Sequence, residues 1–150
     1  METAGLFNFE RFQASIMPYT DMIYFDIKLI DPVAHRKYCG VSNKQILRNF
    51  IRLHELAKHA SFTLLPRTPL IPGITDGVSE IEALAQFHRE QHSHETHLLP
   101  GNPSWLQKLD RIGQQSTFSC IDPIHSFYDP DEENRIRAQF ERHGIKVSIV

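Results

Sequence analysis

The chain has 150 residues, of which 41% are hydrophobic and 23% charged, and its formal net charge is −2. These values are typical of one soluble globular domain with a hydrophobic core. The small net charge gives no reason to expect nucleic acid or an anionic membrane as a partner. No apolar run approaches the roughly 20 residues that span a bilayer, and residues 1–5 do not resemble a secretory signal. We therefore expect a cytoplasmic protein that binds neither nucleic acid nor membrane.

Apolar residues that recur every three or four positions predict helices, and short apolar runs predict strands. The predicted helices lie after Asn8 up to Pro18, at 32–38, from Ser42 to about 60, from Ser79 onward, at 104–110 and at 130–143. Their predicted N-caps include Asn8, the capping boxes of Ser42 with Gln45 and Ser79 with Glu82, and Asp129 with Glu132. The predicted strands lie at 22–27, 62–65, 96–99 and 146–150.

Strands that alternate with helices of this length form parallel βαβ units with right-handed crossovers. Residues 22–27 are nearly all apolar or aromatic, which predicts a strand buried on both faces. The prolines of residues 66–73 predict a stiff loop after the second strand. We expect one α/β domain over residues 1–150, with about four parallel strands in an open sheet or in part of a TIM-type β/α barrel.

Polar residues at the carboxyl ends of parallel strands are candidates for a binding site. Asp26 and Lys28 end the first predicted strand, and the period of two places both side chains on one side. Arg67 follows the second strand and Asn102 follows the third. The pattern alone fits a second interpretation equally well. In it, Asp26 and Lys28 form a simple ion pair, Arg67 is a solvated loop residue and Asn102 is a turn residue.

Other kinds of site have less support. His88, His92, His94 and His97 invite a metal interpretation, but no HExxH motif is present and a polar surface is the favoured interpretation. The sequence contains no GxGxxG, no P-loop and no GxSxG motif. Cys39 and Cys120 lie too far apart for a CxxC motif, so we expect two free thiols, with a disulfide left open.

Five motifs in order carry a resemblance to a known family. They are Glu2–Gly5, Tyr24–Lys28, Gly40–Asn43, Arg67–Asp76 and Leu98–Pro100. Together they resemble the C-terminal half of pyruvate formate-lyase-activating enzyme and of related glycyl-radical enzyme activating enzymes, which are radical SAM proteins. The resemblance implies a partial (β/α)6 barrel, S-adenosylmethionine and a [4Fe–4S] cluster as cofactors, and a glycyl-radical enzyme as partner.

The resemblance also implies roles for individual residues. Asp26 and Lys28 match the family's Asp-x-Lys near the methionine group. Glu2 and Thr3 match a segment beside the methionine and a monovalent cation. Arg67 matches an arginine that faces the cofactor pocket, and Asn102 in part matches a contact with the adenosine.

The cluster ligands of the family are not in this sequence. No CxxxCxxC motif and no Gly-Gly-Glu segment are present, and two cysteines cannot supply three thiolates. The resemblance therefore predicts a chain that lacks the N-terminal half of the barrel, binds neither cofactor tightly and is inactive by itself. The alternative is a non-catalytic half-barrel that binds a ligand or self-associates through its exposed sheet edge.

Overall fold

The computed structural model describes residues 1–115 and 123–150 of the chain. Five strands form a single sheet in the order β1-β2-β3-β4-β5, and all neighbouring pairs are parallel. The strands are β1 (Glu2–Thr3), β2 (Met22–Asp26), β3 (Thr63–Leu70), β4 (Glu95–Pro100) and β5 (Lys146–Ile149). The helices are α1 (Phe9–Ser15), α2 (Pro32–Cys39), α3 (Lys44–Ala57), α4 (Val78–Glu90), α5 (Trp105–Arg111) and α6 (Pro130–Arg142), with 3-10 turns at Met17–Tyr19 and Pro123–His125. The predicted α/β class and parallel pairing are confirmed.

One face of the sheet is covered and the other is open. In β3 the side chains of Pro66, Thr68 and Leu70 are buried, whereas Arg67 and Pro69 between them are only half-buried. Strand β2 alternates in the same way, so the prediction that it is buried on both faces is wrong. The half-buried face of a partial barrel corresponds to its interior, and this is where polar side chains of the strands gather.

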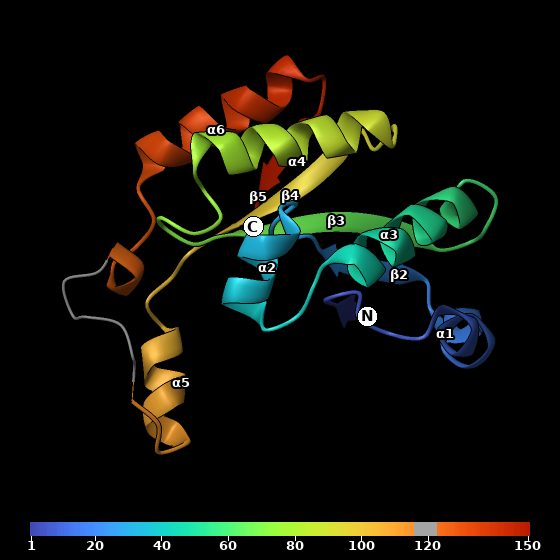
Figure 1. Cartoon of the computed structure of the whole chain (residues 1–150), viewed down its shortest axis with the longest axis horizontal. Coiled ribbons are helices and arrows are strands. Elements are labelled where there is room, and N and C mark those ends of the chain that lie inside the picture. The colour runs from blue at the N-terminus through green and yellow to red at the C-terminus, as the bar shows by residue number, and fades with distance from the viewer. Residues whose placement is uncertain (116–122) are drawn as a thin grey trace.

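Helices cover the buried face of the sheet. Helix α4 packs beside α6 over the β4 and β5 side, and α3 lies against β3 (Figure 1). The core between these layers includes Phe25, Phe50, Leu84 and Phe140, each at most 2% exposed. Burying aromatic and aliphatic side chains in this way is the main favourable contribution to folding.

Strand β3 is longer than its sequence indicates, because prolines interrupt the pattern without ending the strand. Proline removes a backbone donor, and Pro66 and Pro69 therefore favoured a loop. In the structure, the Thr68 hydroxyl donates to the Ile27 carbonyl at 3.0 Å, in place of the N–H that Pro69 lacks. The Thr96 and Thr75 hydroxyls donate to the carbonyls of Pro66 and Pro69 at 3.3 and 2.6 Å. Arg67 consequently lies within β3, in register with Asp26, and the prediction that it follows the strand is wrong.

Two of the predicted helix caps, Asn8 and Asp129, are present, and Asp31 caps α2 in the same way. Each of these side chains accepts a hydrogen bond from a backbone N–H of the first turn. The two predicted serine boxes are wrong, because α3 begins after Asn43 and α4 after Gly77, with no side-chain cap.

The N-terminal segment forms a fifth strand that hydrophobic patterning does not reveal, because β1 has only two residues. Asn49 of α3 fixes the segment from inside, since its Nδ2 donates to the carbonyls of Gly5 at 2.8 Å and Phe7 at 2.9 Å. Gly5 has φ +79°, and a Cβ at this position would collide with the ring of Phe25. Only glycine adopts this turn so close to the core without strain.

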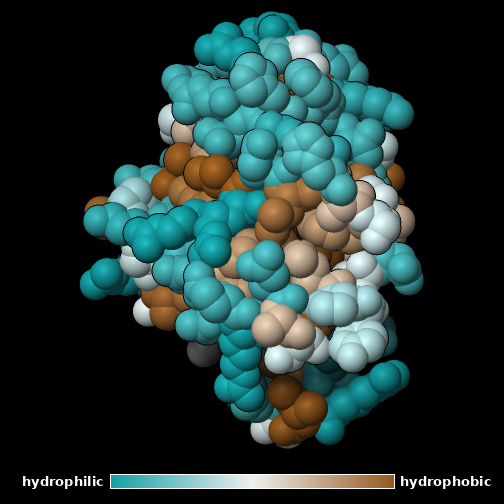
Figure 2. All heavy atoms as spheres, turned by 90° about the vertical axis from the view of Figure 1, so that its right-hand side faces the viewer, coloured by the Kyte–Doolittle hydropathy of each residue, from teal (hydrophilic) through white to brown (hydrophobic). Residues whose placement is uncertain are grey.

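Viewed from the right-hand side of Figure 1, hydrophilic residues cover the top of the molecule and hydrophobic side chains gather across its middle (Figure 2). None of the helices in residues 1–115 and 123–150 is long and apolar enough to cross a membrane.

Candidate functional site

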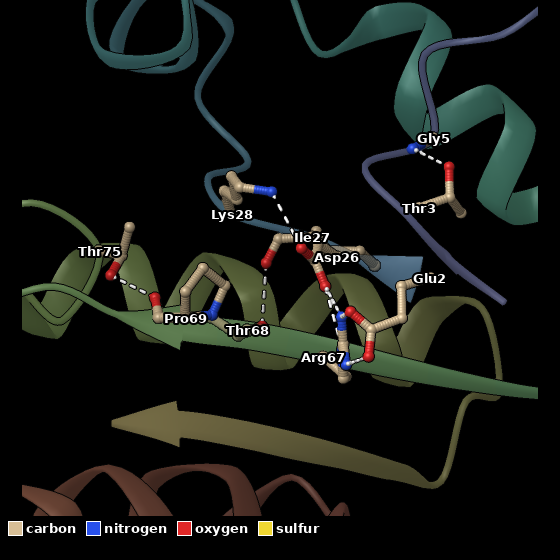
Figure 3. A network of polar contacts seen from close by, with 10 residues as sticks. All are labelled: Glu2, Thr3, Gly5, Asp26, Ile27, Lys28, Arg67, Thr68, Pro69 and Thr75. Atoms are coloured by element: carbon tan, nitrogen blue, oxygen red, sulfur yellow. Dashed lines mark hydrogen bonds and ion pairs between the residues drawn. The ribbon is translucent and has the colours of Figure 1, made fainter. Parts of the chain in front are cut away.

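Four charged side chains meet where β1, β2 and β3 lie side by side (Figure 3). The guanidinium of Arg67 donates to both carboxylate oxygens of Glu2, at 2.9 and 3.1 Å. Its Nε and Nη2 also donate to Oδ1 of Asp26, at 3.1 and 3.0 Å. The ammonium of Lys28 reaches the other oxygen of Asp26 at 3.2 Å. We call Glu2, Asp26, Lys28 and Arg67 the charged network.

The charged network is ordered by its central cation. Arg67 is the least exposed member, with 11% of its side chain accessible, whereas Glu2 is 67% exposed. Hydrogen bonds from Arg67 lower the pKa of Glu2, and the hydrogen bonds to Glu2 and Asp26 raise the pKa of Arg67 against the opposing effect of burial. The ring of Tyr24 lies 5.0 Å from the guanidinium carbon and limits its movement. Two carboxylates and two cations thus stand in fixed positions on the open face of the sheet.

The register of the strands places further polar residues beside the charged network, on the same row across the sheet. Asp26 pairs with Arg67, Arg67 with His97, and His97 with Ser148. His97 and Ser148 are both half-buried, like Arg67. The sequence interpretation assigned His97 to a histidine-rich surface and did not consider Ser148. Side chains of a strand alternate between its two faces, and this alternation within the third predicted strand could have placed His97 on the open face.

Thr3 and Asn102 lie outside the charged network. The Thr3 hydroxyl accepts a hydrogen bond from the backbone N–H of Gly5 at 3.0 Å, which stabilises the turn after β1. Asn102 follows β4, and its side-chain oxygen accepts from the Ser104 N–H at 2.8 Å. It lines a pocket of about 260 Å³ whose other walls include Ile71 and Trp105. The structure therefore unites four of the six predicted site residues and places Asn102 in a separate apolar pocket.

The four histidines do not form one surface group. His92 and His94 are exposed, but His88 is fully buried between Phe50 and Phe140, so the surface interpretation is wrong for His88. Its Nδ1 lies 3.1 Å from the Ser93 hydroxyl, and burial lowers its pKa to about 4. Across residues 1–115 and 123–150, no three His, Cys, Asp or Glu side chains are placed to hold a metal ion. Cys39 is an exposed free thiol, and Cys120 lies outside the described residues.

Comparison with known proteins gives related sequences. The chain is 33% identical, over 89% of its length, to the indoleacetate decarboxylase activating enzyme of Tractidigestivibacter scatoligenes, of which it spans 40%. It is 41% identical, over 49% of its length, to the (2S)-3-sulfopropanediol dehydratase activating enzyme of Klebsiella oxytoca, of which it spans 22%. The chain thus spans well under half of these relatives. No family model matches it.

Solved structures give the same fold. A domain of pyruvate-formate lyase-activating enzyme from Bacteroides vulgatus ATCC 8482 superposes with a TM-score of 0.71 at 21% identity, covering 99% of this chain and 78% of that one. A radical SAM methyltransferase from Sphaerobacter thermophilus superposes with a TM-score of 0.66 at 16% identity, over 99% of this chain and 39% of that one. The chain is therefore a relative of part of the glycyl-radical enzyme activating enzymes, and it shares its fold with part of a radical SAM methyltransferase.

Proposed function

We propose that the chain is the part of a glycyl-radical enzyme activating enzyme that positions S-adenosylmethionine. The observation that supports this most strongly is the charged network, in which Arg67 holds Glu2 and Asp26 while Lys28 keeps donors for a further partner. The relatives named above are activating enzymes. We propose the same activity for a complete enzyme that contains this part. The partner that this enzyme acts on is, by the same proposal, a glycyl-radical enzyme.

The described residues fit the amino-acid end of S-adenosylmethionine. Asp26 and Glu2 offer carboxylate oxygens to an ammonium group, and Lys28 offers N–H donors to a carboxylate. Arg67 holds the carboxylates of Glu2 and Asp26 in place and does not itself contact the proposed ligand. We propose that the adenine lies in the pocket beside Asn102, whose lining includes the apolar side chains of Ile71 and Trp105, with Asn102 as its polar contact. When bound with a reduced iron–sulfur cluster, this cofactor supplies radical chemistry.

The described residues do not fit the [4Fe–4S] cluster. Such clusters are held by cysteine thiolates, usually four or three in number. Cys39 is the one cysteine in residues 1–115 and 123–150, and no group of three metal-binding side chains surrounds it. We derive no step through the cluster, and we propose that the isolated chain does not cleave S-adenosylmethionine.

The alternative of a self-associating half-barrel has one specific observation in its favour. Strands β1 and β5 are the outermost of the sheet, and each has a hydrogen-bonded neighbour on one side only among the described residues. Unpaired strand edges tend to recruit further strands. This alternative concerns assembly and is compatible with cofactor positioning.

The proposal is tested by comparing two ligands with one protein. S-adenosylmethionine and 5′-methylthioadenosine share the adenosine and sulfur, but the second lacks the amino-acid end. We expect titration calorimetry to give weaker binding of 5′-methylthioadenosine by about tenfold, the value of one or two charged hydrogen bonds. Equal affinities, or no binding of either ligand at millimolar concentration, would remove the support for cofactor positioning by the charged network.

A further inference from the structure

The pocket of about 260 Å³ beside Asn102 is lined by three separate segments of the chain. Ile71 and Pro72 belong to the loop after β3, and Gly101 belongs to the loop after β4. Ile124 belongs to the segment that precedes α6. All three segments lie near the carboxyl ends of the strands, on the left of Figure 1. Loops are less constrained than strands, so the shape of this pocket depends on contacts that hold the three segments together.

Tyr128, which directly precedes the cap of α6, links its own segment to the loop after β3. Its hydroxyl donates a hydrogen bond to Oδ2 of Asp76 at 2.8 Å. The other oxygen of Asp76 accepts from the backbone N–H of Gly73 at 2.7 Å, which closes the turn beyond Pro72. One side chain, that of Asp76, therefore holds the turn of its own loop and the segment before α6 at the same time.

The backbone of Tyr128 links the same segment to the loop after β4. Its N–H donates to the carbonyl of Gly101 at 3.2 Å. Gly101 also packs closely on the end of β3, because a Cβ added to it would lie 3.0 Å from the carbonyl oxygen of Leu70. The indole N–H of Trp105 donates to the Ile124 carbonyl at 3.3 Å. The three segments that line the pocket thus converge on Tyr128 and its immediate neighbours.

The surroundings of Tyr128 suit a permanent donor outside the pocket. Its side chain is 7% exposed, and burial first, then the hydrogen bond to Asp76, raises its pKa far above the ordinary value. The hydroxyl is therefore protonated at neutral pH and can donate to Asp76. Tyr128 lines a neighbouring pocket and does not line the pocket beside Asn102. An effect of Tyr128 on a ligand in the latter pocket is consequently indirect.

We propose that Tyr128 is a positioning residue for the adenine of the ligand. Through Asp76 and Gly101 it keeps the loop after β3, the loop after β4 and Ile124 at the separation that a planar base requires. The proposal rests on the proposed function for adenine as the occupant of the pocket. It differs from the role of the charged network, which concerns the amino-acid end of the same ligand.

Tyr128→Phe tests this role, because it keeps the ring that packs near Gly101 and removes the donor to Asp76. We expect calorimetry to show 5′-methylthioadenosine bound about fivefold more weakly than by the wild type. S-adenosylmethionine should be weakened by the same factor, since the two ligands share the adenosine. An unchanged affinity for 5′-methylthioadenosine in the folded variant would overturn the proposal.

Ser93→Ala is the matched control for a general loss of stability. It removes the buried contact of 3.1 Å between Ser93 and His88, and Ser93 lies before the start of β4, at the opposite end of the strand from the pocket. We expect Ser93→Ala to lower the free energy of unfolding in urea and to leave the affinity for 5′-methylthioadenosine unchanged. If it weakens this ligand as much as Tyr128→Phe does, the positioning role is wrong.

A double-mutant cycle tests whether Tyr128 acts through Asp76. In Asp76→Ala the hydroxyl of Tyr128 has lost its acceptor, so adding Tyr128→Phe should weaken 5′-methylthioadenosine no further. Additive losses in the two variants would show that the hydroxyl acts by another route, and the proposal would be withdrawn.

Hydrogen exchange provides a measurement without ligand. In Tyr128→Phe the amides of residues 71–76 should exchange faster than in the wild type, whereas those of β2 should be unchanged. Unchanged exchange in residues 71–76 would contradict the linkage between the two segments.

The outcomes separate this proposal from the proposed function. Equal binding of S-adenosylmethionine and 5′-methylthioadenosine by the wild type, with weaker binding of both by Tyr128→Phe, would reject the charged network as the site and keep the role of Tyr128. A preference for S-adenosylmethionine, with affinities that do not respond to Tyr128→Phe, would do the opposite. A wild-type protein that binds neither ligand would reject both.

Discussion

Arg67 and Asp26 are neighbours in register on adjacent parallel strands, and two nitrogens of Arg67 donate to one oxygen of Asp26, at 3.0 and 3.1 Å. The other Asp26 oxygen is left to Lys28. This division suits the proposed zwitterionic ligand, because Arg67 holds one oxygen of Asp26 while Lys28, on the other oxygen, keeps further N–H donors. The register of β2 and β3 therefore decides the geometry of the site.

Removing the central cation should destabilise the protein. Arg67→Met leaves Asp26 with Lys28 as its described partner and Glu2 with none, and we expect the free energy of unfolding in urea to fall by about 1–2 kcal/mol. Lys58→Met is the matched control, because Lys58 pairs with the exposed Glu55 on the surface and such pairs contribute little. Equal losses in both variants would show that Arg67 is merely a surface residue.

Buried His88 should make stability depend on pH. Its folded pKa of about 4 lies below the unfolded value of 6.5, so the neutral form is favoured by folding. The contribution is fully present above about pH 6.5 and is lost as pH falls toward 4, by up to about 3 kcal/mol. His54, whose pKa is lowered first by burial and then by Lys58, acts in the same direction.

Urea denaturation between pH 7 and pH 4.5 measures this dependence. His88→Leu removes the titrating ring, keeps an apolar side chain and should flatten the curve, although it also leaves Ser93 without its partner. The matched control is His94→Leu, because His94 is exposed. A curve for His88→Leu that falls as steeply as that of the wild type would contradict the role of His88.

The N-terminal segment should detach when its anchor is removed. Asn49 is fully buried and donates to Gly5 and Phe7. Asn49→Ala therefore removes the donor of the Phe7 carbonyl and leaves the Gly5 carbonyl with the Phe7 N–H at 3.2 Å. We expect a loss of about 2 kcal/mol in the free energy of unfolding. Hydrogen exchange should also become faster in residues 2–7 than in β3. Uniform acceleration along the whole chain would instead indicate global destabilisation.

Self-association through the outer strands is a further expectation. Light scattering on this chain should show a dimer or larger species whose proportion rises at micromolar concentration, since β1 and β5 are the outermost strands. A clean monomer at every concentration would count against it. Ile149→Pro in β5 should reduce the association if that strand takes part, because the N–H groups of Lys146 and Val150 pair with β4 and the alternate N–H of Ile149 faces the open edge.

Much of the fold could be predicted from sequence because its elements are locally encoded. The caps at Asn8, Asp31 and Asp129 and the apolar runs of β2 and β4 each depend on a few adjacent residues. Strand β3 could not be predicted in full, since its pairing continues past two prolines and the Thr68 hydroxyl donates to the Ile27 carbonyl in place of the N–H that Pro69 lacks. That contact joins residues that are distant in sequence.

The same reasoning explains which parts of the site were found. Asp26 and Lys28 were recognisable from their spacing, and the resemblance added Glu2. The position of His97 beside Arg67 depends on the register between β3 and β4, which no local pattern specifies. The burial of His88 likewise depends on α3 and α6 packing around it, because aromatic rings from both helices contact it.

We propose that the charged network binds the amino-acid end of S-adenosylmethionine, and a substitution of Asp26 tests this binding. Asp26→Asn keeps the size of the side chain but removes the charge that an ammonium would recognise. Calorimetry should show S-adenosylmethionine bound about fivefold to tenfold more weakly than by the wild type, with no change for 5′-methylthioadenosine. An unchanged affinity for S-adenosylmethionine in a folded Asp26→Asn protein would contradict the claim.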